Sequence, residues 1–297
     1  QERYITARRV WWLNQYARGS NVKVLHVGNI ANNAYSNAKF LRRKGVEADV
    51  LCYDYRHIMA QPEWEDAVFE GDPDEFEPDW SVIDAGDFKR PGWFQQDTLA
   101  LNGAHRTQRF KGQFRLERIL FGLPSLWVQV WTTYLKCLRA GGPSMPHVVD
   151  LLHYASKSKR FEEWFEGYDL IQAYATEPIH AWMFSSSQPY VAFEHGTMRD
   201  IPFENSARGR LLSLAYRQAG KVVITNPDVI TAARRLGLKN FLFIPHPVDE
   251  TKYRPLHTSL RGDLANRYQA DLILLAPSRH NWDLKGNDLL LKAFARC

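Results

Sequence analysis

The feature that most constrains the fold is a repeated alternation of short apolar runs with segments of helical periodicity. The apolar runs lie at residues 21–28, 46–53, 168–174, 190–193, 221–225 and 241–244. The segments with helical spacing lie between them, at residues 34–44, 150–164, 208–218 and 229–236. Short, nearly continuous apolar runs are typical of strands buried on both faces. The alternation therefore predicts an α/β protein with a parallel, doubly wound, Rossmann-like sheet.

A second part of the chain begins where this alternation stops. Residues 245–261 open with Pro-His-Pro-Val-Asp and show little periodicity, which predicts a linker between domains. An apolar run at 271–277 then predicts a new strand, and Asn287 or Asp288 is expected to cap the helix that follows. We therefore assign residues 1–255 to an N-terminal Rossmann-like domain and residues 256–297 to the start of a second, incomplete one.

Composition sets the broad class of protein. The 297 residues are 45% hydrophobic, enough to fill the cores of two ordinary domains. Cys52, Cys137 and Cys297 are scattered without metal-binding spacing, and no secretory signal segment opens the chain, so we expect a cytoplasmic protein without disulfides. A first residue other than Met and an end just after an amphipathic run favour a fragment of a longer protein. The net charge of +5 forms no long basic stripe with interleaved aromatic residues, so nucleic-acid binding is not expected.

The densest cluster of chemically active side chains follows the apolar run at 190–193. Glu194, His195 and Arg199 lie within six residues, together with Gly196. Open α/β sheets bind ligands at the carboxyl ends of their strands, where this cluster is expected to lie. His195 is the strongest candidate, because neighbours along a strand point to opposite faces and Glu194 can face away from the site. The alternative is a capped turn in which His195 and Arg199 only satisfy structural contacts.

A glycine turn follows the first apolar run. Gly28 and Asn29 connect the predicted strand to the predicted helix at 34–44. Such a turn can bind a phosphate or a sugar hydroxyl through its backbone N–H groups at the helix N-terminus. Gly28 stands alone, without the second and third glycines of a dinucleotide fingerprint. Asn29 is either a ligand contact, on the acceptor side, or a helix cap.

Two basic residues follow the predicted strand at 271–277. Arg279 and Lys285 lie in the turn before a predicted helix. A guanidinium that bonds two oxygens, an ammonium and a helix N-terminus together suit a diphosphate. The alternative is a solvated basic turn.

Each of two long segments has two alternative roles. Residues 54–112 read as irregular, and loops of that length inside a compact domain are usually functional or mobile. Residues 114–138 are rich in apolar and aromatic side chains, with Trp127 and Trp131 flanked by basic residues. Polar interruptions make this segment a poor bilayer span, so the alternatives are an interfacial membrane helix and a buried pair of helices.

Three motifs in the second half of the chain resemble family 4 glycosyltransferases. They are Asn226-Pro-Asp, the segment from Ile244 to Pro255, and the segment from Pro277 to Leu290. The resemblance implies a GT-B fold, in which two Rossmann-like domains face each other across a cleft. It also implies transfer with retention at the anomeric carbon and no need for a metal. The first domain of that fold mainly serves the acceptor, and the second mainly binds the nucleoside-diphosphate sugar.

The resemblance also implies roles for particular residues. Arg279 and Lys285 match the residues that hold the donor diphosphate, Gly28 matches the glycine turn that faces it, and His195 matches the histidine near the transferred sugar. The family's two-glutamate motif would lie beyond the last residue, so the chain is expected to stop early in the donor domain and to be inactive alone. Asp72 and Asp74 have the spacing of a metal-binding pair, but no apolar strand precedes them, so we expect no metal site.

The sequence thus predicts a hexosyltransferase-type glycosyltransferase. Its donor would be a nucleoside-diphosphate sugar, used as a substrate with no further cofactor, and its acceptor a glycan or a lipid-linked glycan. Fixed cations at the leaving diphosphate would stabilise the transition state more than the ground state. Two alternatives remain: a nucleotide-sugar epimerase of the same fold, and a non-catalytic glycan- or membrane-binding protein that acts through residues 114–138. Peripheral contact of residues 114–138 with the inner face of a membrane is compatible with catalysis.

Overall fold

A computed structural model describes most of the chain. The described residues are 22–53, 55–71, 73–76, 78–97, 127, 130–139, 145–155, 158–185, 188–255, 259–275 and 286–296. The chain divides into two compact units, Gln1–Pro247 and Val248–Cys297. The domain boundary at residue 255 stays a prediction.

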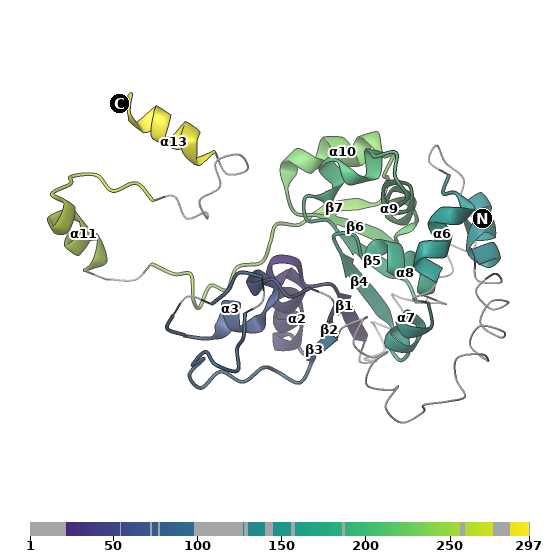
Figure 1. Ribbon diagram of the computed structural model, residues 1–297, viewed down its shortest axis with the longest axis horizontal. Coiled ribbons are helices and arrows are strands. Elements are labelled where there is room, and N and C mark those ends of the chain that lie inside the picture. Colours follow the sequence, from purple (N-terminus) through teal and green to yellow (C-terminus); the bar gives the residue numbers. More distant parts are fainter. Residues whose placement is uncertain are drawn as a thin grey trace. The chain divides into compact units, whose positions relative to one another are not determined.

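The first unit is organised around one sheet. Among the described residues it has seven strands in the order β3-β2-β1-β4-β5-β6-β7, and each neighbouring pair is parallel (Figure 1). The strands are β1 (Lys23–Val27), β2 (Glu47–Tyr53), β3 (Phe94–Asp97), β4 (Leu170–Tyr174), β5 (Tyr190–Phe193), β6 (Lys221–Ile224) and β7 (Phe241–Phe243). The predicted α/β class with a doubly wound, Rossmann-like sheet is confirmed for this unit.

Helices connect these strands. The α-helices of the first unit are α2 (Asn33–Arg43), α3 (Pro62–Asp66), α6 (Val148–Ala155), α7 (Ser158–Phe165), α8 (Pro178–Phe184), α9 (Ala207–Gln218) and α10 (Ile230–Arg235). Short 3-10 turns are η1 (Ile30–Asn32), η2 (Ile58–Ala60), η3 (Thr197–Arg199), η4 (Ile201–Phe203) and η5 (Pro227–Val229). Residues 130–139 are also helical.

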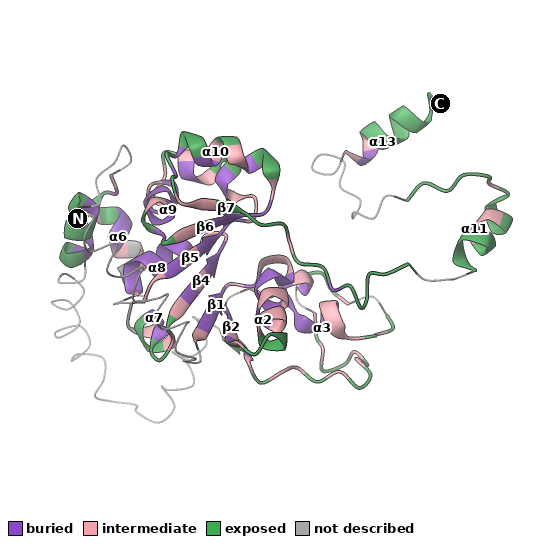
Figure 2. Ribbon diagram, turned by 180° about the vertical axis from the view of Figure 1, so that it is seen from behind, coloured by how far each residue is buried: buried purple, intermediate pink, exposed green. Residues whose placement is uncertain are grey.

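The core lies on both faces of the sheet, because alternate residues of each strand point to opposite sides. Val24 and Val50 pack with α2 on one face. Leu25 and Ile171 pack with α7, α8 and α9 on the other. Figure 2 shows the strands and the inward sides of these helices as buried. Burial on both faces explains why the strands read as continuous apolar runs in the sequence.

The strand order reverses direction at β1. The chain moves from β1 outward to β2 and β3, and then returns to place β4 on the other edge of β1 before continuing to β7. Such a reversal leaves a crevice between the loops that follow the two central strands, and ligands of open α/β sheets bind there. We therefore expect a ligand site at the loops that follow β1 and β4. The loop after β5 lies next to them, because β5 pairs with β4.

The segment expected to be irregular contains regular structure. Besides α3, it supplies edge strand β3, in which Phe94 pairs with Val50 of β2 and is buried. The strand is only four residues long, and Phe94 is its only apolar residue. A short edge strand of this composition has no periodic pattern that sequence reasoning could detect.

In the second unit the described residues form two helices, α11 (Leu260–Tyr268) and α13 (Asn287–Phe294). The sequence predicts a strand at 271–277, but the structure assigns no strand to residues 271–275. A parallel strand needs a hydrogen-bonded neighbour, and the described residues of this unit provide none for it. The expected side-chain cap at Asn287 or Asp288 also differs, because Gly286, with φ of 63°, holds the N-cap position.

Candidate functional site

The turn after β1 has a strained backbone. Gly28 has φ of 82°, and its N–H donates to the carbonyl of Leu51 at 3.0 Å. Ala31 and Asn32 also have positive φ values, 48° and 54°. Non-glycine residues in this region cost about 1–2 kcal/mol each, and such strain often accumulates at functional sites. The turn directs the N-terminus of α2 toward the carboxyl edge of the sheet.

Asn29 fixes the shape of this turn. The residue is buried, and its Oδ1 accepts the backbone N–H of Tyr35 at 2.8 Å. Its Nδ2 donates to Oδ1 of Asn32 and to the carbonyl of Ala60, both at 2.8 Å. These contacts match the capping alternative. A role for Asn29 in binding the acceptor stays a prediction, and the geometry gives it no support.

His195 is joined to the same turn. Nδ2 of Asn33, the first residue of α2, donates to Nδ1 of His195 at 3.0 Å and to the carbonyl of Ile30 at 2.7 Å. Because Nδ1 accepts, a neutral His195 ring carries its proton on Nε2. The ring of His246 packs edge-on against His195, with centroids 5.4 Å apart, and burial lowers the pKa of His246. The contact with Asn33 places the loop after β5 and the loop after β1 in one site.

Glu194 lies beside His195 but is enclosed. Its side chain is 0% exposed, and Oε1 accepts the N–H of Met198 at 3.2 Å. Oε2 is buried and has no hydrogen-bond partner among the described residues. Burial raises the pKa of Glu194, and backbone N–H groups and the charge of Arg199 offset this only in part. A carboxyl group with a raised pKa at a ligand-binding edge is a candidate functional group.

Arg199 contacts an acid on the neighbouring loop. Its Nε donates to Asp228 at 2.7 Å and its Nη2 at 3.3 Å, and both side chains are about half exposed. The guanidinium lies over Gly196, where a Cβ atom would be 2.4 Å from Nη1. The φ of 87° at Gly196 explains why a glycine stands there. The contacts agree with the structural alternative for Arg199, and its role toward a ligand stays a prediction.

Sequence reasoning missed a cluster beside Gly28. The hydroxyl of Tyr53, the last residue of β2, donates to Oε2 of Glu177, and Nδ1 of His180 lies 2.9 Å from that oxygen. The Glu177 side chain covers Gly28 so closely that a Cβ atom on the glycine would lie 2.7 Å from its Cγ. Ala175, two residues before Glu177, has φ of 54°. The available signal was a carboxylate directly after a strand and before a helix-starting proline, in Ala-Thr-Glu-Pro.

Several predicted features lie outside the described residues or outside this site. Arg279 and Lys285 are not among the described residues, so their diphosphate-binding role stays a prediction. Within the part of the chain that the structure describes, no three His, Cys, Asp or Glu side chains are grouped so that they could hold a metal ion.

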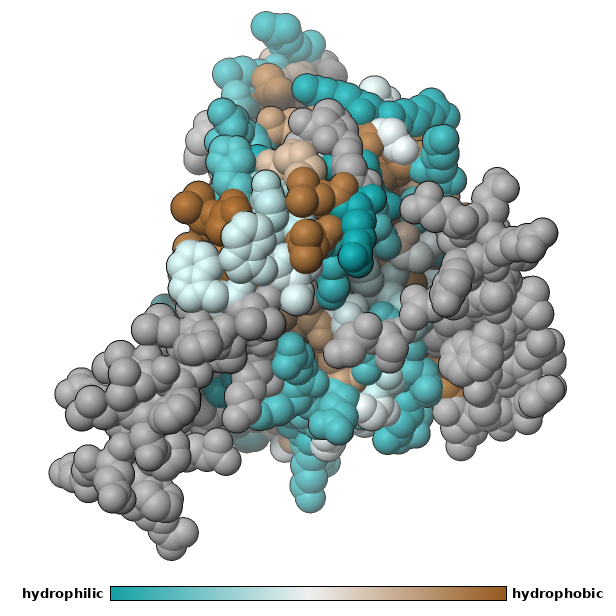
Figure 3. Space-filling view, turned by 90° about the vertical axis from the view of Figure 1, so that its right-hand side faces the viewer, coloured by the Kyte–Doolittle hydropathy of each residue, from teal (hydrophilic) through white to brown (hydrophobic). Residues whose placement is uncertain are grey.

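The described part of the Trp-rich segment is a helix with two apolar sides. Val130 and Cys137 face the core, whereas Trp131, Leu135 and Leu138 are about half exposed. Figure 3 shows a face of the molecule on which hydrophobic side chains gather beside hydrophilic ones. None of the described helices is long and apolar enough to span a bilayer. The residues of 114–138 before Trp127, and 128–129, lie outside the described residues.

Comparison with known proteins adds little to the geometry. No protein-family model and no curated protein matches the chain. Among solved structures, one similar chain is a sucrose-phosphate synthase from Thermosynechococcus elongatus, with a TM-score of 0.34 and 13% identity over 84% of this chain and 99% of that one. A likeness at this level assigns no activity to the chain.

Proposed function

We propose that this chain belongs to a glycosyltransferase that moves a sugar from a nucleoside-diphosphate sugar to a glycan or lipid-linked acceptor. The observation that carries the proposal is the hydrogen bond of 3.0 Å between Asn33 and His195. It unites the glycine turn after β1 with the histidine after β5 at the reversal of strand order. That edge is where open α/β sheets bind nucleotides and sugars, and the sequence resemblance proposes the same two elements.

The turn after β1 is suited to an anionic or hydroxyl-rich ligand. The space that a side chain at Gly28 would fill is taken by the Glu177 side chain, so a ligand at this turn would meet Glu177 and the N-terminus of α2. The first N–H groups of α2, a helix of 11 residues, lie at the same edge and carry the positive end of its dipole. Glu177 also lies over Gly28, and its carboxylate can accept hydrogen bonds from sugar hydroxyls.

His195 is proposed to orient the transferred sugar. Asn33 fixes the orientation of its ring and the protonation of Nε2, so the ring acts as a neutral donor. A donor held in this way loses little entropy when it binds a hydroxyl group of the sugar. Glu194 lies on the enclosed side of the same strand end, and we assign it to supporting this loop through Met198.

Arg279 and Lys285 are proposed to bind the leaving diphosphate. Negative charge grows on that group as the glycosyl bond breaks, so cations placed there stabilise the transition state. We further propose retention of configuration, no metal requirement and a cytoplasmic location. These details rest on the sequence resemblance and on composition.

The test is an assay of nucleoside-diphosphate release with UDP and GDP sugars, with and without a mixture of glycan and lipid-linked acceptors. It uses the product of the whole reading frame that contains this chain. Acceptor-dependent release that falls at least tenfold in His195→Ala, but not in the control His147→Gln at an exposed histidine outside this site, is expected. Donor consumption without acceptor would support the epimerase alternative. Unchanged turnover in His195→Ala would overturn the assignment of this residue.

The exposed side of the helix at 130–139 favours peripheral membrane contact as an additional property. Trp131, Leu135 and Leu138 recur at helical spacing, and Lys136 and Arg139 stand beside them. Flotation with anionic vesicles is expected to be lost in Trp131→Ser with Leu135→Ser. Equal flotation of this variant and the unchanged protein would exclude the helix as the contact.

A further inference from the structure

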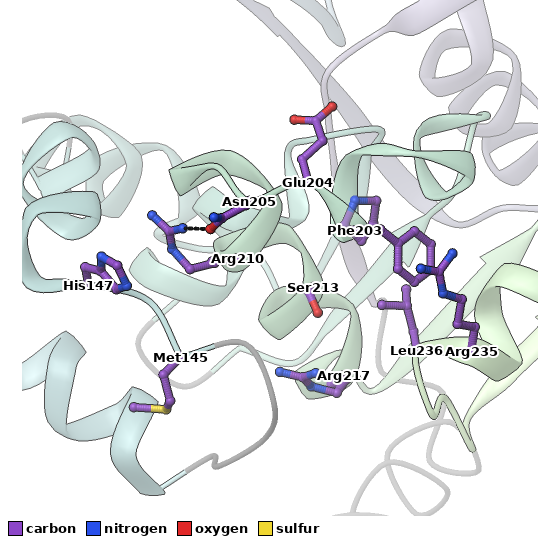
Figure 4. Close-up of a pocket in the computed structure, with 11 residues that line it drawn as sticks. Met145, His147, Phe203, Glu204, Asn205, Arg210, Ser213, Arg217, Arg235 and Leu236 are labelled. Carbon is purple, nitrogen blue, oxygen red and sulfur yellow. Dashed lines mark hydrogen bonds between the residues drawn. The ribbon is translucent and has the colours of Figure 1, made fainter.

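A hollow lies beside α9, and His195 is not among the residues that line it. Its volume is about 560 Å³, and side chains from α9, α10 and η4 line it (Figure 4). Ligand pockets typically measure about 300–1,000 Å³, so the cavity has room for a small organic molecule rather than an inorganic ion alone. The proposal that follows does not depend on the glycosyl-transfer activity.

The spacing of polar residues on α9 directs them into this cavity. Arg210, Ser213 and Arg217 follow one another at intervals of three and four residues and all line the cavity. Residues at this spacing lie on one side of a helix. Helix α9 therefore presents two guanidinium groups and a hydroxyl group as one polar stripe.

Arg217 is the residue that most clearly lacks a counterion. Its Nη2 is buried and has no hydrogen-bond partner among the described residues. Burial lowers the pKa of Arg217, and no neighbouring acid offsets this effect. Arg217 is partly buried, and an N–H group that is buried without a hydrogen-bond partner is unfavourable, so an anion that accepts from Nη2 would remove that cost.

Arg235 presents a second guanidinium from α10. Its Cζ lies 4.1 Å from the centroid of the Phe203 ring, so the two groups stack, as Figure 4 shows. Stacking on an aromatic face leaves the N–H groups at the edge of the guanidinium able to donate. Phe203 therefore holds Arg235 in a position to bind an anion.

Arg210 and Glu204, which also line the cavity, have partners within the protein. Arg210 donates to both carboxylate oxygens of buried Asp150, at 2.8 and 2.9 Å. Glu204 has Arg208 at 3.7 Å and accepts from the hydroxyl of Ser206 at 3.1 Å. The charges of Arg217 and Arg235 therefore dominate the cavity, which favours an anionic ligand.

We propose that this cavity binds a small phosphate ester, whose phosphate group Arg217 binds while Arg235 supplies a second positive charge in the lining. Guanidinium groups bind phosphate through paired N–H···O bonds. The remaining volume, lined by Met145, Pro202 and Leu236, receives the organic part of the ester. The phosphate group comes either from a soluble phosphorylated sugar or from a phosphatidic acid headgroup.

The test measures the thermal midpoint of the chain with glucose 6-phosphate, glucose and glucuronate, and its flotation with phosphatidic acid vesicles and with uncharged vesicles. Arg217→Met and Arg235→Gln remove the two cations. Arg234→Gln is the matched control, because it removes an exposed charge from the same helix outside the cavity. Far-ultraviolet circular dichroism establishes that each variant is folded.

A midpoint shift with glucose 6-phosphate, or flotation with phosphatidic acid, identifies the source of the phosphate. Either response is expected to weaken about tenfold or more in Arg217→Met and Arg235→Gln, because each loses charge-assisted hydrogen bonds. The control is expected to respond like the unchanged chain. Equal binding of glucuronate, absence of both responses, or full responses in both cavity variants would overturn the proposal.

Discussion

The burial of His26 predicts that the free energy of unfolding falls in acid. The side chain, on central strand β1, is 0% exposed, and the hydroxyl of Tyr174 donates to its Nδ1 at 2.7 Å. Its Nε2 is buried without a hydrogen-bond partner among the described residues. Burial lowers the pKa of His26 from 6.5 to about 3. The folded protein therefore keeps this ring neutral at a pH where the unfolded chain already binds a proton.

The sign and size of the effect follow from these two pKa values. Because the folded pKa is the lower one, the contribution of His26 to stability is complete above pH 6.5 and is lost as the pH falls toward about 3. Each pH unit in that window removes about 1.4 kcal/mol. Lowering the pH to about 4.5 should therefore cost about 2.7 kcal/mol of unfolding free energy through this group alone.

The assay is urea unfolding at about pH 7, 5.5 and 4.5, followed by circular dichroism. His26→Phe removes the titrating ring and is expected to remove about 2.7 kcal/mol of the loss between the highest and lowest pH. Tyr174→Phe is the matched control, because it removes the same hydrogen bond but keeps the buried imidazole. That control should retain the pH dependence of the unchanged chain. Equal pH dependence in His26→Phe and the unchanged chain would refute the reasoning.

Three further predictions concern the glycine turn, the enclosed acid and a buried thiol. Gly28→Ala should lower the free energy of unfolding by about 1–3 kcal/mol more than Gly45→Ala in urea unfolding. Both glycines have φ of 82°, but the new Cβ would meet Glu177 at 2.7 Å only at Gly28. Equal losses would argue against the close contact. Glu194→Gln should stabilise the chain at neutral pH and lose this advantage below pH 4.5, because the raised pKa destabilises the fold only where the unfolded chain is ionised; urea unfolding without a gain at neutral pH would contradict this. Burial raises the pKa of the Cys52 thiol to about 12, so iodoacetamide at about pH 8 should modify it only after denaturation, as mass spectrometry can establish; rapid labelling of the folded chain would disprove it.

Sequence reasoning succeeded where a local pattern coincided with a tertiary role. The runs that became β1, β5 and β6 are apolar because these strands are covered on both faces. Edge strand β3 escaped detection because Phe94 alone anchors it. The run at 271–275 shows the opposite error, since an apolar run forms no strand without a neighbouring strand.

The candidate site divides in the same way. Gly28 and His195 follow strand ends, so their sequence positions placed them at the carboxyl edge. Glu177 was missed because its relation to Gly28 depends on β4 lying next to β1, which no local pattern encodes. The contact between Asn33 and His195 also joins distant parts of the chain. Residue types and strand ends were therefore predictable, but the pairing of loops required the sheet order.

The place of β1 between β2 and β4 has a consequence for how the chain is made. One edge of β1 can pair with β2 once residue 53 has been synthesised. The other edge can pair only after Leu170–Tyr174 have been synthesised. Until then the nascent chain carries an apolar strand with unbonded N–H and C=O groups, which invites pairing with other molecules. Pairing with β4 closes this edge and completes the ligand-binding crevice, and the open edge then lies on β4 until Tyr190–Phe193 can pair with it.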